Sequence, residues 1–306
     1  MIVATVPSAL RGAVGDLEGM QILSWDLRES PPAHDRIEVV VLPPWNAPWI
    51  TRLTELPVLR GLQLGSAGHE HALRFLPAGV ELANAVGVHD TATAEMALAL
   101  ILAAQRDIPD FVRAQGVGEW PKPGQRRSLA DSTALIYGYG GIGQALAKRL
   151  QACEVTVIAV ARRAKPGDGV VEQVYAESQL GELLPHADIA AIAAPLTQAT
   201  RGAFGPRHLG LLPDDALVVN VGRGPIIDTD ALIAECGTDR LRAALDVTDP
   251  EPLPPDHPLW STAGVLISPH TAGSTSAFEP RMARFVRTQL TAYRDDGVLP
   301  HVVATG

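Results

Sequence analysis

The second half of the chain alternates short apolar runs with segments of helical periodicity. Six runs rich in Val, Ile and Ala have the length of buried strands, and they cover residues 133–137, 155–160, 188–193, 216–221, 241–247 and 265–268. Residues 144–152, 178–185 and 229–236 have the periodicity of helices, with Asp228 or Thr229 placed to cap the third of them. This alternation predicts βαβ units around a buried parallel sheet with right-handed crossovers.

The first 90 or so residues also contain short apolar runs, with helical or loop segments between them. Buried strands are predicted at residues 1–6, 22–25, 37–42 and 58–64, which favours a second, smaller α/β domain. A long Ala-rich and Leu-rich helix is expected at 93–115, broken near Pro109, as a hinge between the halves. The amphipathic segment 281–293 follows the last strand and could return to the N-terminal domain.

Composition and charge narrow the class of protein. The 306 residues suffice for two domains, and 46% hydrophobic with 19% charged residues is typical of a globular chain. The net charge of −9 disfavours nucleic acid as a partner, and the longest apolar run, 96–104, is too short to cross a membrane. Cys153 and Cys236 suit neither a disulfide framework nor a zinc site, and no histidine pattern indicates a metal. A cytoplasmic protein is therefore expected.

A glycine-rich turn joins the first strand of the second half to its helix. Gly138, Gly140 and Gly143 form G-x-G-x-x-G in the context of strand, loop and helix that a dinucleotide site requires. The phosphates of the cofactor would then lie at the N-terminus of the helix that opens at Ile142, with Gly141 in the same loop.

The end of the second strand bears on the choice of cofactor. An NAD site commonly has an acid there for the ribose hydroxyls, but this chain has Ala161 followed by Arg162 and Arg163. Arginine can bind a 2′-phosphate with charge-assisted bonds, so NADP(H) is favoured, with NAD(H) possible. The alternative is that the two arginines belong to a solvated loop.

Three further polar segments lie at or just beyond strand ends of the same predicted sheet. They are residues 220–224, 246–252 and 268–273. Ligands of open α/β sheets bind outside the carboxyl ends of the strands, so the three segments are expected to converge on the cofactor crevice.

In order and type, these motifs resemble the D-isomer-specific 2-hydroxyacid dehydrogenase family over nearly the whole chain. Three further sets of residues match that family: Gln63, Ser66, Ala67 and Gly68 in a substrate loop; Asn84, Gly87, Ala94 and Glu95 at the hinge entry; and Pro195, Leu196, Thr197, Thr200 and Arg201 after the third strand. The resemblance implies a doubly wound parallel sheet of the Rossmann type in residues 93–274. It also implies a smaller flavodoxin-like α/β substrate domain formed by 1–92 and 275–306.

The resemblance also implies roles for particular residues. Arg223 would bind the carboxylate and carbonyl of a 2-keto acid, His270 would be the proton donor, and Glu251 would orient the imidazole and favour its charged form. The backbone of Ala67 and Gly68 would bind the substrate carboxylate, and closure of the cleft would exclude water. The residues expected at the cofactor are Gly138, Gly140, Gly141, Ile142, Gly143, Arg162, Arg163, Pro195, Thr200, Val221, Gly222, Asp246 and His270. Asp246 could instead support the loop or tune the histidine.

Departures from the family pattern refine this expectation. Ala161 in place of the usual acid points to the NADP-using branch that resembles glyoxylate/hydroxypyruvate reductases, and Thr248 replaces an aromatic residue, which would loosen local packing. Glu251 argues against formate dehydrogenase, and the end at Gly306 leaves no room for the regulatory domain of some phosphoglycerate dehydrogenases. The principal hypothesis is NADP(H)-dependent reduction of a small 2-keto acid to the D-2-hydroxy acid by a homodimer.

Two alternatives remain at this point. One is a dinucleotide-sensing protein resembling corepressors of the same fold, and the other is a dehydrogenase of another small anion such as phosphite. The specific substrate depends on pocket shape, for which Trp45, Trp49, Leu64 and Met282 are candidate walls, with burial in the core as the alternative.

Overall fold

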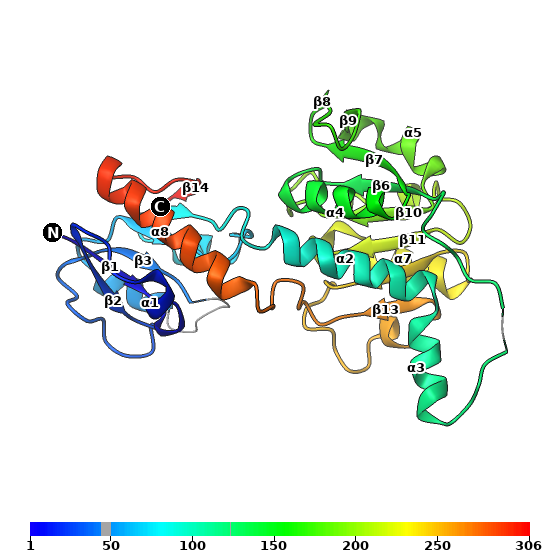
Figure 1. Ribbon diagram of the computed structural model, residues 1–306, viewed down its shortest axis with the longest axis horizontal. Helices are drawn as coiled ribbons and strands as arrows, with labels where there is room; N and C mark the ends of the chain where they lie inside the picture. Colours follow the sequence, from blue (N-terminus) through cyan, green and yellow to red (C-terminus); the bar gives the residue numbers. More distant parts are fainter. Residues whose placement is uncertain (44–49, 123) are drawn as a thin grey trace. The chain divides into compact units, whose positions relative to one another are not determined.

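The computed structural model describes residues 1–43, 50–122 and 124–306. The chain divides into two compact units, the first formed by 1–89 with 275–306 and the second by 90–274 (Figure 1). Within the described residues, no helix is both long and apolar enough to cross a membrane.

Unit 1 is built on a six-stranded sheet with the order β14-β5-β4-β3-β1-β2. All neighbours pair in parallel except β14 with β5. The strands are β1 (Ile2–Val6), β2 (Met20–Ser24), β3 (Ile37–Val41), β4 (Gly61–Gln63), β5 (Glu81–Ala83) and β14 (Val302–Thr305). Of these, β5 and β14 escaped the sequence-based prediction, because three-residue and edge strands carry little hydrophobic pattern.

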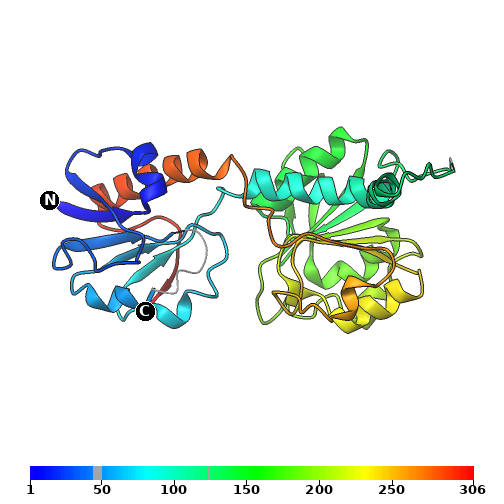
Figure 2. The same cartoon turned by 90° about the horizontal axis from the view of Figure 1, so that it is seen from below.

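The two faces of this sheet are covered by different elements. Helices α1 (Ser8–Val14) and α8 (Phe278–Asp296) pack on one face, side by side in Figure 2. The 3-10 helices η1 (Ile50–Glu55) and η2 (Leu73–Phe75) lie toward the other, where Leu53 joins the core. The sheet has a hydrophobic core on each face, and successive residues of β1 point into different cores. Ala4 packs in the core under α1 and α8, and Val3 packs in the core on the opposite face.

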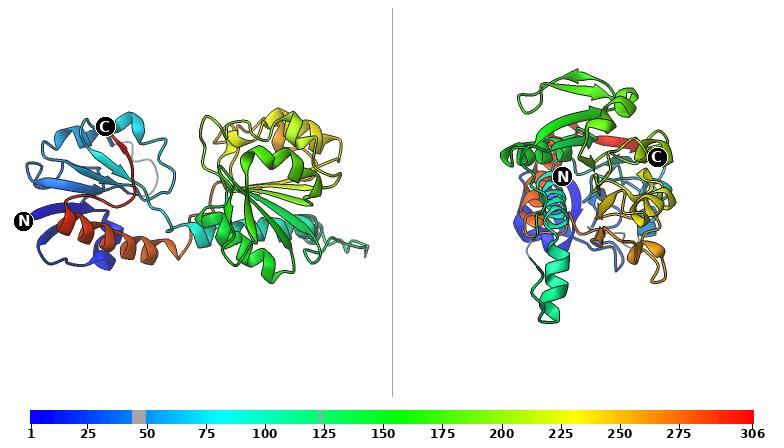
Figure 3. Two further views of the ribbon diagram at one scale, coloured as in Figure 1. Left: turned by 90° about the horizontal axis from the view of Figure 1, so that it is seen from above. Right: turned by 90° about the vertical axis from the view of Figure 1, so that its right-hand side faces the viewer.

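Unit 2 is a three-layer arrangement around an eight-stranded sheet with the order β13-β12-β11-β10-β6-β7-β9-β8 (Figure 3). All pairs are parallel except β8 with β9. The strands are β6 (Thr133–Tyr137), β7 (Thr156–Ala161), β8 (Lys165–Pro166), β9 (Gln173–Ala176), β10 (Ile189–Ile192), β11 (Leu217–Asn220), β12 (Arg242–Leu245) and β13 (Val265–Ile267). The sequence predicted six of these eight; β8 and β9 were missed because they are short and partly polar.

Helices cover both faces of the unit 2 sheet. On one face lie α2 (Asp90–Gln105) and α4 (Gly141–Ala152), and on the other α5 (Leu180–Leu183), α6 (Pro206–Leu209) and α7 (Thr229–Gly237). Asp228 caps α7 by accepting a 3.0 Å hydrogen bond from Ala231 N. The strand order reverses between β6 and β10, which is where doubly wound sheets bind their ligands.

The helix expected at 93–115, with a break near Pro109, is two helices in the structure. α2 ends at Gln105, and α3 (Ile108–Gly116) begins after Asp107, which has a left-handed φ of 51°. Pro109 lies in the first turn of α3, where a missing N–H is harmless, so the break precedes the proline. We call residues 106–122, which include α3, the arm.

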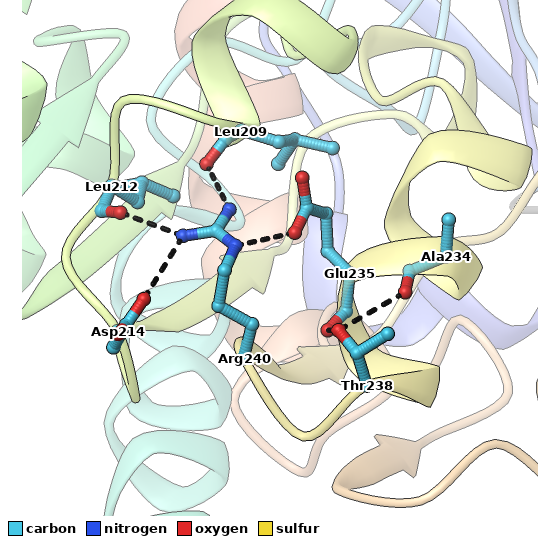
Figure 4. Close-up of polar contacts among 7 residues, drawn as sticks. All are labelled: Leu209, Leu212, Asp214, Ala234, Glu235, Thr238 and Arg240. Carbon is cyan, nitrogen blue, oxygen red and sulfur yellow. Dashed lines mark hydrogen bonds and ion pairs between the residues drawn. The ribbon is translucent and has the colours of Figure 1, made fainter.

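An arginine connects α6 and α7 on one face of the unit 2 sheet (Figure 4). Arg240 donates to the carbonyl oxygens of Leu209 at 2.8 Å and Leu212 at 2.9 Å, and its Nε pairs with Glu235 of α7 at 2.5 Å. The side chain thereby connects the end of α6 to α7.

Candidate active site

Three loops meet at the carboxyl ends of adjacent strands in unit 2. Arg223 follows β11, Glu251 follows β12 and His270 follows β13, and these strands are neighbours in register. The parallel arrangement therefore places all three side chains at one edge of the sheet, as the sequence predicted for their segments.

The loop after β11 is held by the side chain of Asn220. This buried amide donates from Nδ2 to the carbonyl of Arg223 at 3.0 Å and accepts from Gly222 N at 3.0 Å. Arg223 itself donates from Nη1 to the carbonyl of Gly222 at 2.7 Å. Val221 is buried, and a Cβ on Gly222 would come within 2.7 Å of Ala194 O, so the loop packs closely on the β10 end.

Glu251 and His270 form a short hydrogen bond, with 2.5 Å between Oε1 and Nδ1. The bond raises the pKa of His270 above its ordinary value of 6.5, against the opposing effects of burial and of the Arg223 charge. The same bond lowers the pKa of Glu251, and the charge of Arg223 adds to this. The pair is therefore stable as carboxylate and imidazolium beside a guanidinium.

Asp246 holds the backbone of the histidine loop. Its side chain is 1% exposed and accepts hydrogen bonds from Ser268 Oγ at 2.6 Å, Thr271 N at 3.0 Å and Ala272 N at 3.0 Å. Its carbonyl accepts from His270 N at 2.8 Å, and His270 has a φ of 51°. Both carboxylate oxygens thus bind the protein itself, which fits the loop-supporting role rather than direct contact with a cofactor.

Two threonines fix the loop that carries Glu251. Thr248, expected to loosen packing in place of an aromatic residue, is 8% exposed and donates to the carbonyl of Pro250 at 2.9 Å. Thr229 donates to the carbonyl of Asp249 at 2.9 Å. The hydroxyl of Thr248 therefore supplies a bond inside the loop, and the looser packing expected at this position stays a prediction.

The glycine loop after β6 has the shape needed for a pyrophosphate. Gly138 has a φ of +105°, and a Cβ there would lie 2.4 Å from Ala194 N. A Cβ on Gly143 would lie 2.4 Å from Gly138 O, whereas one on Gly140 would meet nothing within 4 Å. Gly140 thus leaves open space beside the first turn of α4, which contains Gly141, Ile142 and Gly143, and the residues present fit a dinucleotide.

A cavity of about 280 Å³ adjoins this loop. Its lining includes Arg162, Pro195 and Thr200 from the predicted cofactor set, together with Tyr137 and Glu177. Thr200 donates to the carbonyl of Pro195 at 2.7 Å, which closes the turn after β10. Arg162 and Arg163 are exposed where the acid of an NAD site is commonly found.

The substrate loop predicted at Ala67 and Gly68 lies in unit 1, after β4. Ser66 Oγ donates to the carbonyl of Gly68 and Asn84 Nδ2 to that of Ala67, both at 2.7 Å. His89 Nε2 lies 2.8 Å from Gly65 O. In the described part of the chain nothing accepts a hydrogen bond from the N–H of Ala67 or Gly68, so both amides can bind an anion.

The other candidate wall residues divide into two groups. Leu64 and Met282 are buried in the cores of unit 1, whereas Trp45 and Trp49 lie outside the described residues. Sequence reasoning missed the structural importance of Tyr137, Tyr139 and Glu177. Tyr139 lies within the glycine motif and donates 3.2 Å bonds to Asp168, a contact that no local pattern could indicate.

The chain is similar in sequence to a family model and to several known proteins. Residues 98–272, more than half of the chain, match the family model described as D-isomer specific 2-hydroxyacid dehydrogenase, NAD binding domain. A glyoxylate reductase of Aeropyrum pernix is 35% identical over 235 residues, covering 74% of this chain and 70% of that protein. A Corynebacterium melassecola protein described only as uncharacterized is 38% identical over 195 residues, 63% of this chain and just under two thirds, 64%, of its own length.

A solved structure extends the likeness to the whole fold. The NADPH-dependent glyoxylate/hydroxypyruvate reductase of Sinorhizobium meliloti, in complex with NADP and sulfate, is 27% identical and superposes with a TM-score of 0.81. The match covers 98% of this chain and 97% of that one, so both units take part in it.

Proposed function

This chain belongs to the D-isomer-specific 2-hydroxyacid dehydrogenase family, whose members are nicotinamide-dependent oxidoreductases, and we propose that it reduces a small 2-keto acid with NADP(H). The product would be the D-2-hydroxy acid, and glyoxylate and hydroxypyruvate are the substrates we favour, in keeping with the names of the relatives. The observation that carries this proposal is the Glu251–His270 hydrogen bond beside the charge of Arg223.

Each polar group then has a task in the reduction. Arg223 binds the keto acid through its guanidinium, because two N–H groups can fork onto carboxylate and carbonyl oxygens. The amides of Ala67 and Gly68 bind the substrate carboxylate. His270 gives the proton on Nε2 to the carbonyl oxygen, since Glu251 occupies Nδ1. A dinucleotide held by the glycine loop and the N-terminus of α4 would supply a hydride for the carbonyl carbon, which together with the proton from His270 would reduce the carbonyl group to the hydroxyl.

The His270 role is tested by His270→Ala. We expect NADPH to bind normally and the turnover of glyoxylate and hydroxypyruvate to fall by about 10²–10⁴-fold, the usual contribution of a general acid. NADPH binding is followed by fluorescence and turnover by absorbance of the reduced nicotinamide. Wild-type turnover in the variant would refute the assignment. Tight binding with no turnover by the wild-type protein on any keto acid would favour the sensing alternative.

The cofactor preference rests on Arg162 and Arg163. Replacing both with Gln should weaken NADPH much more than NADH, because each lost charge-assisted bond to the 2′-phosphate costs about 1.5–3 kcal/mol. Dissociation constants for both nucleotides provide the measurement. Arg149→Gln, a change on the far turns of α4, is the matched control and should alter neither. Equal weakening of both nucleotides would show that the pair does not contact the 2′-phosphate.

We also propose a homodimer. α2 packs against α4, β11 and β12 of its own unit. The arm instead exposes apolar side chains, with Val112 at 61%, Val117 at 71% and Trp120 at 92%. Such a cluster on one projecting segment favours burial against a second copy of the chain.

Oligomeric state tests this surface. Val112→Asp combined with Trp120→Ser should shift the mass in sedimentation equilibrium from twice 32.4 kDa to 32.4 kDa. Trp260→Ser removes another exposed tryptophan, 52% accessible and outside the arm, and should leave the dimer intact. A wild-type mass of 32.4 kDa would contradict the proposal.

A further inference from the structure

The cavity beside the glycine loop has mostly apolar walls, with one acidic side chain, Glu177, and one basic side chain, Arg162. Ala161, Ala193, Ala194 and Pro195 contribute to its lining, with Glu177 among them. A dinucleotide whose pyrophosphate lies at the N-terminus of α4 would place its adenosine half at the ends of β7 and β10, where this cavity opens. A space of about 280 Å³ with such walls suits a flat aromatic base.

Glu177 reaches this cavity from the far side of β7. Ala161 and Ala176 are register partners on β7 and β9, so Arg162 and Glu177 are the first residues beyond the paired positions. The carboxylate of Glu177 nevertheless accepts a hydrogen bond from the hydroxyl of Tyr137 on β6. Since β7 lies between β6 and β9, the contact spans the end of β7.

Tyr137 holds this carboxylate in a fixed place. Its side chain is 2% exposed, and its ring packs edge-on against Phe204 with 5.4 Å between centroids. The phenol donates to Oε1 of Glu177 only. The buried phenol of Tyr137 thus fixes the position of Oε1 of Glu177, whose side chain is partly exposed.

The second oxygen of Glu177 is available to a ligand. Within the described residues no donor contacts Oε2, whereas the hydroxyls of Thr197 and Thr200 are already bonded to each other at 3.1 Å. Thr200 also donates to the carbonyl of Pro195. An ionised carboxylate only accepts, so its partner in this cavity must be an N–H or O–H donor.

We propose that Glu177 recognises the adenine base by accepting a hydrogen bond from its exocyclic 6-amino group. This inference rests on the proposed dinucleotide site. The amino group is the only N–H donor of the base in a nucleotide, and it is common to NADH and NADPH. Tyr137 acts as a positioning residue that keeps the acceptor oriented. A base with a carbonyl oxygen at this position would face the carboxylate with two acceptors and be rejected.

The test compares NADPH with its analogue that carries hypoxanthine in place of adenine. Fluorescence titration should show the wild-type protein binding the analogue at least about tenfold more weakly, a loss that one charge-assisted bond accounts for. Glu177→Gln should bring the two affinities within about twofold, because the amide can donate to the hypoxanthine oxygen. Tyr137→Phe should reduce the discrimination partly. Glu182→Gln, an exposed acid on the next turns of the chain, should leave it unchanged.

Two outcomes would overturn this inference. Discrimination unchanged in both Glu177→Gln and Tyr137→Phe would mean that neither residue reads the base. If Glu177→Gln weakened the binding of NADH and left the binding of NADPH unaltered, Glu177 would lie at the 2′-hydroxyl of the adenosine ribose. That hydroxyl is free in NADH and phosphorylated in NADPH. The readout is binding, so base-selective binding without reduction of any keto acid would refute the proposed reaction and still support the role of Glu177.

Discussion

The hydrogen bond between Glu251 and His270 determines which proton the imidazole can give away. Oε1 of Glu251 is bonded to Nδ1, so the proton that we propose His270 gives to a substrate is the one on Nε2, and the charge of Glu251 favours the imidazolium. Asp246 complements this bond from the backbone side by binding the loop around the histidine. Orientation and protonation of one side chain thus come from two different acids.

The direction of the His270 shift predicts the pH dependence. Reduction requires the imidazolium, and its pKa is raised above 6.5, so kcat/KM for the keto acid should be constant at low pH and decline only above that value. Glu251→Gln removes the carboxylate that raises the pKa, so the midpoint of the decline should move to lower pH. A pH profile of both proteins measures this, and coincident midpoints would contradict it.

At the same scale, sequence and structure differ in what they reveal. The positions of Arg223, Glu251 and His270 at one edge of the sheet were predictable, because each follows a recognisable apolar strand in a short polar segment. Their catalytic roles come from the resemblance to the family and stay predictions. Glu177 was not, because its significance depends on a contact with Tyr137, 40 positions earlier in the chain. Periodicity detects which residues face a core, but it cannot detect which side chains meet across three strands.

At the scale of elements, the arginine between α6 and α7 shows how loops gain stability. Replacing Arg240 with Met would remove the donor to the carbonyl of Leu212, one of the two donors to the carbonyl of Leu209, and the cation that pairs with Glu235. We expect a loss of about 1–2 kcal/mol, moderated because the side chain is 25% exposed. Thermal unfolding should show a lower midpoint, whereas Arg207→Met, at an exposed position of α6, should change little. Equal midpoints for Arg240→Met and wild type would contradict this.

The elements missed by sequence analysis share a physical property. β8, β9 and β14 contain exposed positions and β5 has only three residues, so none of them leaves a clear apolar run in the sequence. The central strands β6, β10 and β11 are nearly all buried and were predicted almost to the residue. A strand that is buried on both faces over several residues appears in the sequence as a continuous apolar run.

For the whole molecule, the important feature is that the sequence of unit 2 is inserted between the two segments that form unit 1. Unit 2 occupies residues 90–274, and the core of unit 1 contains Met282, Val286 and Leu290 from α8. α8 packs against α1, which lies near the other end of the chain, and β14 completes the sheet beside β5. The contacts that close unit 1 therefore join segments separated by all of unit 2.

This discontinuity has a consequence for biosynthesis. On the ribosome, the residues of unit 2 emerge together and can fold as soon as residue 274 is free, whereas the N-terminal strands of unit 1 must wait for α8. Until then, the apolar face that α8 covers, including Val6 and Val39, has no partner from that helix. The N-terminal strands of unit 1 are therefore synthesised before unit 2 but reach their native state after it, and their need for protection by chaperones should be greatest during that interval.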